Sequence, residues 1–263
     1  MTYYAEIAAN TCNCKIVLNG LGIAELKAEK IGSFQYPCNT ELVGKANVLS
    51  MQVMPATIDL SVLNKIRAEC VIKRYADTDM VTPDSGAVIT FSSLQQKIDE
   101  IKANPLSANI AGLVPFTVSA TFDSEDAPSF ADRLLGSKPI KDKEALKDWA
   151  MAFRALLEKR DIDALYALYE PKLLDYDKAY PAQKEPDNRV WFKNWMLKKI
   201  FPQTPFTDFS RDEVDPVSWC EGRVWELRLK DGNPLWRTLG LDGKRTKIEV
   251  YAGLDDGKIK IVR

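Results

Sequence analysis

The sequence predicts a two-domain protein, in which an N-terminal antiparallel β-sandwich is followed by an α+β domain of helices packed on a curved antiparallel sheet. Three observations support this fold class. Apolar residues recur with a period of two in the first half of the chain. They recur with a helical period between residues 143 and 200. A period of two returns after Arg223, where Asp-Gly pairs separate the runs.

The two halves also differ in composition. All six tryptophans lie at or beyond Trp149, whereas four of the five cysteines lie before Val71. Between the halves, residues 136–141 form a short segment that contains Gly, Ser, Lys and Pro, which is typical of a connection. We therefore expect a β-sandwich domain at 1–137 and the α+β domain at 138–263.

Strands are expected throughout the first half. Residues 14–18 and 21–26 flank Asn19-Gly20, a dipeptide that favours the φ > 0 of a hairpin turn. Further strands are expected at 3–8, 47–53, 69–75, 87–91 and 114–122, and a short helix at 94–103. Short strands at this spacing favour a sandwich.

Three amphipathic helices are expected between 143 and 200. Apolar residues of the first share one face, Asp161 can cap the second, and the third follows Asp187 and ends before Pro202. Asp175-Tyr176-Asp177 lies in a polar stretch after Pro171, where we expect a solvated loop or a helix end.

The end of the chain is expected to form a meander of strands. Trp225, Leu227 and Leu229 alternate with polar residues, so one face of the sheet is apolar, as it is when helices cover one side. Three dipeptides are the expected hairpin turns: Asp231-Gly232, Asp242-Gly243 and Asp256-Gly257.

Helices followed by a curved meander, with the segments 149–168 and 247–263, resemble the nuclear transport factor 2-like superfamily. The resemblance spans about 143–263 and implies a cone whose sheet wraps a long helix, as in ketosteroid isomerases. It also implies a pocket at the mouth of the cone and an early strand, which residues 173–189 do not show. In the first half, residues 42–49 (Leu-Val-Gly-Lys-Ala-Asn-Val-Leu) resemble a segment of jelly-roll domains of the galactose-binding type.

Histidine is absent, which excludes Ser–His–Asp and Cys–His catalysis and His-ligated metal sites. Phosphate-binding glycine loops and nucleophile elbows are missing from the sequence as well, so we expect no cofactor. The Cys12-x-Cys14 pair is either half of a metal or redox site or two small side chains at a strand entry. We expect no metal there, because the remaining cysteines have irregular spacing.

The net charge of −1 gives no basic footprint, so nucleic acid is not an expected partner. No stretch approaches the roughly 20 apolar residues that span a bilayer, so no membrane contact is expected. Five cysteines without a regular framework and the lack of a secretory signal indicate a cytoplasmic protein.

If the protein is an enzyme, the cone candidates are Asp148, Tyr166 and Asp177. A carboxylate can act as the base while a phenol donates to a developing oxyanion. Otherwise, aromatic and charged residues form a ligand-binding or interface set: Trp191, Trp219, Trp236, Arg223 and Arg237. Trp219 is expected in a loop, and Trp236 on the outer face of its strand, where a Trp beside an Arg is typical of a protein interface.

Two hypotheses follow. The first is a non-catalytic binding protein, such as a bacterial immunity or accessory protein, that acts through contacts with another protein. The alternative is a small-molecule enzyme or carrier with an Asp/Tyr pair and a Trp-lined pocket. Exposed strand edges in either half can also pair to form a homodimer.

Overall fold

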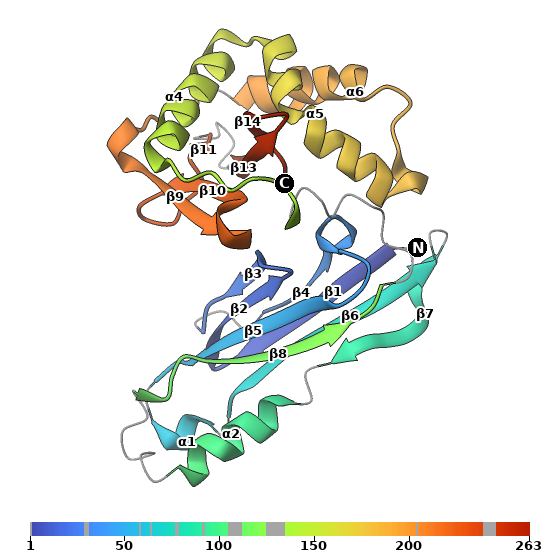
Figure 1. The fold of residues 1–263 in the computed structure, drawn as a ribbon, viewed down its shortest axis with the longest axis vertical. Helices are drawn as coiled ribbons and strands as arrows, with labels where there is room; N and C mark the ends of the chain where they lie inside the picture. Colours follow the sequence, from blue (N-terminus) through green and yellow to red (C-terminus); the bar gives the residue numbers. More distant parts are fainter. Residues whose placement is uncertain are drawn as a thin grey trace. The chain divides into compact units, whose positions relative to one another are not determined.

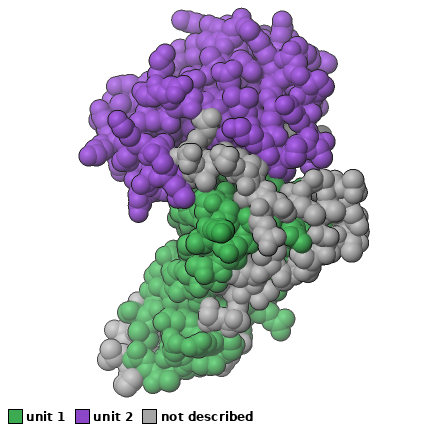
Figure 2. Space-filling view, turned by 45° about the vertical axis from the view of Figure 1, so that its right-hand side comes forward, with its two compact units in different colours: residues 1–131 green, residues 132–263 purple. Residues whose placement is uncertain are grey.

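The computed structural model describes residues 2–28, 32–57, 59–63, 65–76, 79–90, 93–104, 112–124, 135–203, 205–238 and 246–263. The fold belongs to the α+β class, with antiparallel sheets and helices (Figure 1). Contacts within the chain separate two compact units, Met1–Ala131 and Asp132–Arg263 (Figure 2). We describe each unit by itself.

Unit 1 contains two four-stranded antiparallel sheets, ordered β4-β1-β6-β7 and β3-β2-β5-β8. The strands are β1 (Thr2–Asn10), β2 (Cys12–Leu18), β3 (Leu21–Leu26), β4 (Gly32–Pro37), β5 (Asn47–Pro55), β6 (Arg67–Ala76), β7 (Asp79–Thr90) and β8 (Phe116–Phe122). The short helical elements are η1 (Asn39–Glu41), α1 (Leu60–Leu63) and α2 (Ser93–Ala103). The strands expected in this half are confirmed, whereas β4 and the two shortest helices had no clear sequence signal.

The expected hairpin at Asn19-Gly20 is confirmed. β2 pairs with β3, and both turn residues have positive φ, 50° for Asn19 and 84° for Gly20. Alternate residues of both sheets point into one shared hydrophobic core, as shown by Ile7 of β1, Ile16 of β2 and Met51 of β5. The period-two pattern therefore identified the buried face of these strands correctly.

Unit 2 begins with helices α4 (Lys143–Lys159), α5 (Ile162–Ala179) and α6 (Asn188–Trp195), which continues into the π-helical turn η4 (Met196–Ile200) and the turn η5 (Phe201–Gln203). A short turn, η3 (Pro181–Gln183), lies between α5 and α6. The predicted cap is confirmed, because Asp161 accepts from the backbone N–H of Ala164, and Asp187 caps α6 in the same way by accepting from that of Val190. A side-chain acceptor at this position satisfies an N–H that the first helical turn cannot pair.

Residues 175–177 lie at the C-terminal end of α5, so of the two expected alternatives the helix end is correct and the solvated loop is wrong. α5 continues through Pro171 to Ala179, so these residues lie inside a helix. A proline inside a helix removes one backbone hydrogen bond, at a cost of about 3 kcal/mol. Burial of Tyr169, Pro171 and Asp175 on the same helix offsets that loss, which is why α5 continues past the proline.

The sheet of unit 2 is antiparallel, with the order β14-β13-β10-β9. Its strands are β9 (Val214–Trp219), β10 (Val224–Leu229), β13 (Val250–Asp255) and β14 (Lys258–Ile261), and β11 (Trp236–Arg237) pairs with β12 (Lys247–Ile248). Turns η6 (Arg211–Glu213) and η7 (Cys220–Gly222) flank β9. Asp256-Gly257 forms the β13–β14 turn with positive φ at both residues, and Asp231-Gly232 forms a turn after β10. Asp242-Gly243 lies outside the described residues.

The expectation of a loop around Trp219 is wrong, because Trp219 ends the strand β9. Pro216 made that segment resemble a loop, but β9 is the edge strand of its sheet, where proline is tolerated since one side of the strand needs no ladder hydrogen bond.

Aromatic rings fill the interior of unit 2. Phe153 of α4 lies 4.5 Å from Trp236, and Tyr169 of α5 lies 6.2 Å from Phe153, measured between ring centres. Trp236 is 0% exposed, so the prediction that it faces outward is wrong. β11 has only two residues, which is too short for alternation along the strand to fix which side chain is buried.

Candidate functional site

A groove in unit 2 is formed where α5 ends, the chain turns through η3, and α6 begins. It encloses about 240 Å³. Its lining residues are Leu173, Tyr176, Asp177, Tyr180, Gln183, Glu185, Asn188 and Trp191. We call it the α5–α6 groove. The four residues from the end of α5 have the spacing i, i+3, i+4, i+7, so they share one face of the helix.

The aromatic side chains of the groove are held by contacts along the helices. The rings of Tyr176 and Tyr180 lie 5.6 Å apart at 41°. Trp191 is stacked on Trp195, with ring centres 6.0 Å apart and planes within 5°. Trp195 in turn contacts Tyr169 of the core. Trp191 therefore has one supported face, although 37% of it is exposed.

One hydrogen bond joins the two sides of the groove. The amide Nδ2 of Asn188, at the start of α6, donates to Oδ2 of Asp177 on α5 over 2.7 Å. Asp187 caps the N-terminus of α6, and Asn188 is the first residue of that helix. This bond holds the start of α6 close to the end of α5.

The groove is small for a metabolite but suits part of a macromolecule. Ligand pockets usually enclose roughly 300–1,000 Å³, whereas this groove encloses about 240 Å³. Five of the eight large hydrophobic side chains that are exposed in the described residues lie on α5, α6 and η4: Leu174, Tyr176, Val190, Trp191 and Leu197. This share of the exposed apolar side chains on three neighbouring segments favours an interaction surface there.

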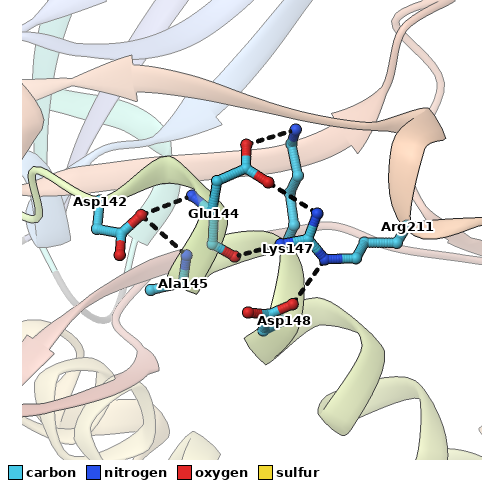
Figure 3. Close-up of polar contacts among 6 residues, drawn as sticks. All are labelled: Asp142, Glu144, Ala145, Lys147, Asp148 and Arg211. Carbon is cyan, nitrogen blue, oxygen red and sulfur yellow. Dashed lines mark hydrogen bonds and ion pairs between the residues drawn. The ribbon is translucent and has the colours of Figure 1, made fainter.

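Asp148, a predicted catalytic residue, lies in a surface network instead (Figure 3). Its carboxylate accepts from Nε of Arg211 at 2.6 Å, and Nη1 of Arg211 donates to Glu144 at 2.7 Å. Lys147 completes the network by donating to Glu144 over 2.8 Å. The network ties η6 to the start of α4, and the Asp148 side chain is 67% exposed. These contacts indicate a structural role.

This network makes stability depend on pH at the acid end. Hydrogen bonds from Lys147 and then Arg211 lower the pKa of Glu144, so folding favours its ionised form. That contribution is complete above the unfolded-state pKa of about 4.3 and is lost as the pH falls through the lower folded-state pKa. We expect wild type to be more stable than Glu144→Gln at pH 7, with the difference closing below about pH 4 in denaturant titrations. The control repeats the comparison in a background that lacks Lys147 and Arg211. If Glu144→Gln lowers the stability there by the same amount, the hydrogen bonds from these two residues are not the cause.

The other two catalytic candidates lie close to the groove, but they do not form an acid–base pair. Asp177 lines the groove and accepts from Asn188. Tyr166 lies about three turns earlier on α5, edge-on to Phe192 at 5.8 Å. Burial chiefly raises the pKa of Tyr166, and nearby carboxylates, Asp177 among them, raise it further. The phenol therefore stays protonated, and each candidate carboxylate has another partner.

The five interface candidates do not form one surface. Among them, only Trp191 lines the groove. Trp219 donates from Nε1 to Glu226 over 3.2 Å, and Arg223 donates to the carbonyl of Cys220 over 3.1 Å. Both lie beside η7, whereas Trp236 is buried and Arg237 follows it on β11.

The Cys12 and Cys14 thiols are buried and free. Burial raises the pKa of Cys12 to about 11, and burial together with the neighbouring thiols of Cys12 and Cys70 raises that of Cys14 to about 12. No group of three or more His, Cys, Asp or Glu side chains among the described residues is arranged to hold a metal ion. These thiols pack as small apolar groups in the core of unit 1.

We expect all five cysteines to resist alkylation in the folded protein, because the thiolate is the reactive form and burial suppresses it. Iodoacetamide at pH 8 followed by intact-mass measurement should show no adduct in buffer and five in denaturant. Fast modification of Cys12 or Cys14 in the native protein would show instead that this pair is open to solvent.

Unit 1 has a larger depression of about 650 Å³ on β4, β1 and β6. Its central carboxylate, Glu6, pairs with Lys73 at 2.6 Å and accepts from Tyr75 at 2.7 Å and Gln35 at 3.1 Å. These groups satisfy one another, and Phe34 is the only aromatic residue in the described lining. The depression therefore offers a ligand less than the α5–α6 groove does.

Sequence reasoning named Trp191 and Asp177 but missed Leu173, Gln183 and Glu185. Extending α5 beyond Pro171 would have revealed that face of the helix.

Comparison with protein-family models, with curated proteins and with solved structures found no match. No helix in the described part of the chain has both the length and the apolar character needed to cross a membrane.

Proposed function

We propose that this chain is a non-catalytic binding protein that docks another protein through the α5–α6 groove and the apolar residues around it. One observation carries the proposal: most of the exposed large hydrophobic side chains of the described residues gather on α5, α6 and η4. Tyr176 and Trp191, the two members of this group that line the groove, are residue types enriched at binding hot spots.

The interior of unit 2 supports this function over the alternative of an enzyme or carrier. A catalytic cone needs an open cavity that holds a base, but Phe153 and Trp236 occupy the space between α4 and the strands. Asp148, the candidate base on α4, points to Arg211 at the surface. A bacterial immunity or accessory protein is one kind of non-catalytic binding protein, and we propose this role within that class.

We further propose a jelly-roll β-sandwich for unit 1 and a nuclear transport factor 2-like cone for unit 2. Supporting the first are two antiparallel sheets that share one core. Supporting the second are helices that contact the sheet β14-β13-β10-β9. The long α5, in place of an early strand, departs from that superfamily. The proposed setting is the cytoplasm, because five buried thiols without a disulfide suit a reducing compartment.

The test is affinity capture from a lysate of the source organism, compared among three baits. These are wild type, Tyr176→Ala with Trp191→Ala, and Phe34→Ala with Val48→Ala. The last pair is a matched control, because Phe34 and Val48 are 39% and 42% exposed, close to the 37% and 42% of Trp191 and Tyr176. Circular dichroism checks that each bait is folded.

We expect one protein to be enriched on wild type and on the control but lost from the groove variant. With that protein purified, calorimetry should show at least about 30-fold weaker binding to the groove variant, as removal of a hot spot costs about 2 kcal/mol or more. Equal binding by all three baits would overturn the proposal. Light scattering of the purified chain shows whether a second copy is the partner.

A further inference from the structure

The α5–α6 groove combines features that suit an organic cation. Three aromatic residues line it, Tyr176, Tyr180 and Trp191, together with the two carboxylates of Asp177 and Glu185. No Lys or Arg is among its described lining residues. The negative face of an aromatic ring attracts a cation within about 6 Å, and a neighbouring carboxylate adds a direct charge interaction.

Both carboxylates have acceptor capacity left. Asp177 uses Oδ2 to accept from Asn188, and among the described residues its Oδ1 has no hydrogen-bond partner. Glu185, in the connection before α6, has none on either oxygen within the same part of the chain. A carboxylate accepts several hydrogen bonds when ionised, so the groove can satisfy an N–H donor that carries positive charge.

Among the groove rings, Trp191 presents an exposed surface to a guest. Tyr176 and Tyr180 are tilted by 41° and so are not stacked on each other, and Trp195 covers one face of Trp191 while Trp191 remains 37% exposed. The chain itself shows that this helix pair favours such contacts. Lys172 Nζ lies 5.9 Å from the Tyr176 ring centre, and the Arg189 guanidinium lies 5.9 Å from that of Tyr166.

We propose that the α5–α6 groove binds the cationic side chain of a lysine or arginine that the partner protein presents, an inference that rests on the proposed function. A side chain rather than a free metabolite is the occupant for two reasons. The groove encloses only about 240 Å³, and other exposed apolar residues of α6 and η4, such as Val190 and Leu197, offer contact area for the rest of a protein.

The test uses two small probes on the full chain, N-acetyl-lysine methylamide and its neutral counterpart N-acetyl-norleucine methylamide. Binding is followed by NMR at the indole N–H of Trp191, assigned with Trp191→Phe. We expect the norleucine probe to bind roughly 5- to 30-fold more weakly, the range that a cation–π contact supplies. Asp177→Asn with Glu185→Gln should abolish the preference. Asp212→Asn with Glu249→Gln, an equal charge change at exposed positions, should retain it.

Equal affinity for the two probes would overturn the inference, and so would a preference that survives in Asp177→Asn with Glu185→Gln. If the groove binds choline but not the lysine probe, its ligand is a small quaternary ammonium compound and not a protein side chain, and the inference is overturned too. If the preference is absent while the Tyr176→Ala, Trp191→Ala bait still loses its captured protein, the cation site fails and the docking function stands. If the preference is present but no protein is captured, the docking function fails.

Discussion

Trp236→Ala is expected to destabilise unit 2 by about 3–5 kcal/mol, the usual cost of removing a large aromatic side chain from a core. The side chain is 0% exposed and packs against Phe153 and Phe209, with ring centres 4.5 Å and 6.1 Å away. Its loss would leave a cavity among rings that helix and strand backbones hold in place. Guanidinium unfolding followed by tryptophan fluorescence measures the effect. This signal reports on unit 2 alone, because every tryptophan lies there.

Two further substitutions control this experiment. Trp236→Phe should cost less than half as much, because Nε1 of Trp236 has no hydrogen-bond partner among the described residues and phenylalanine removes that buried donor. Trp191→Ala, at an exposed tryptophan, should cost about 1 kcal/mol or less. A loss below about 1 kcal/mol for Trp236→Ala would show that this side chain is not part of the core.

Asp175→Ala is expected to destabilise unit 2 by a similar amount, about 3–5 kcal/mol. The Asp175 carboxylate on α5 accepts from Nη1 of Arg263 at 2.7 Å, and the two side chains are only 1% and 4% exposed. Removing the carboxylate leaves a buried guanidinium without its counter-charge, which costs far more than the pair contributes by itself. Denaturant unfolding followed by fluorescence again gives the measurement.

A double-mutant cycle separates the ion pair from simple loss of packing. Asp175→Leu combined with Arg263→Met removes both charges but keeps apolar volume, so we expect the double variant to be more stable than either single variant. Asp163→Ala, on the same helix, breaks an exposed pair with Arg189 and should change stability little. Additive losses for Asp175 and Arg263 would show that the two charges are not coupled.

Local patterns predicted much of the secondary structure correctly. Asn19-Gly20 and Asp256-Gly257 marked turns that need φ > 0, and Asp161 and Asp187 marked helix starts that need an acceptor. These signals succeed because the residue and the backbone geometry it favours lie within a few positions of each other. The alternation along β10 succeeded for the same reason.

The errors occurred where distant contacts outweighed local preference. The polar stretch after Pro171 left a solvated loop as one expectation, yet burial of Tyr169 and Asp175 keeps α5 intact to Ala179. That extension also creates the face of α5 that lines the groove, so the candidate site could be identified only in part. Trp191 and Asp177 were identified as single residues, and their common groove was not.

The sequence by itself therefore determined the α+β class, the order of most elements and the exclusion of histidine chemistry, because composition and short-range periodicity carry that information. Only the tertiary structure decided that Trp236 is buried, that Asp148 pairs with Arg211, and that α5 and α6 form a groove. Each of these depends on which side chains meet across the fold. A two-residue strand or a single surface carboxylate has no periodicity from which its neighbours can be inferred.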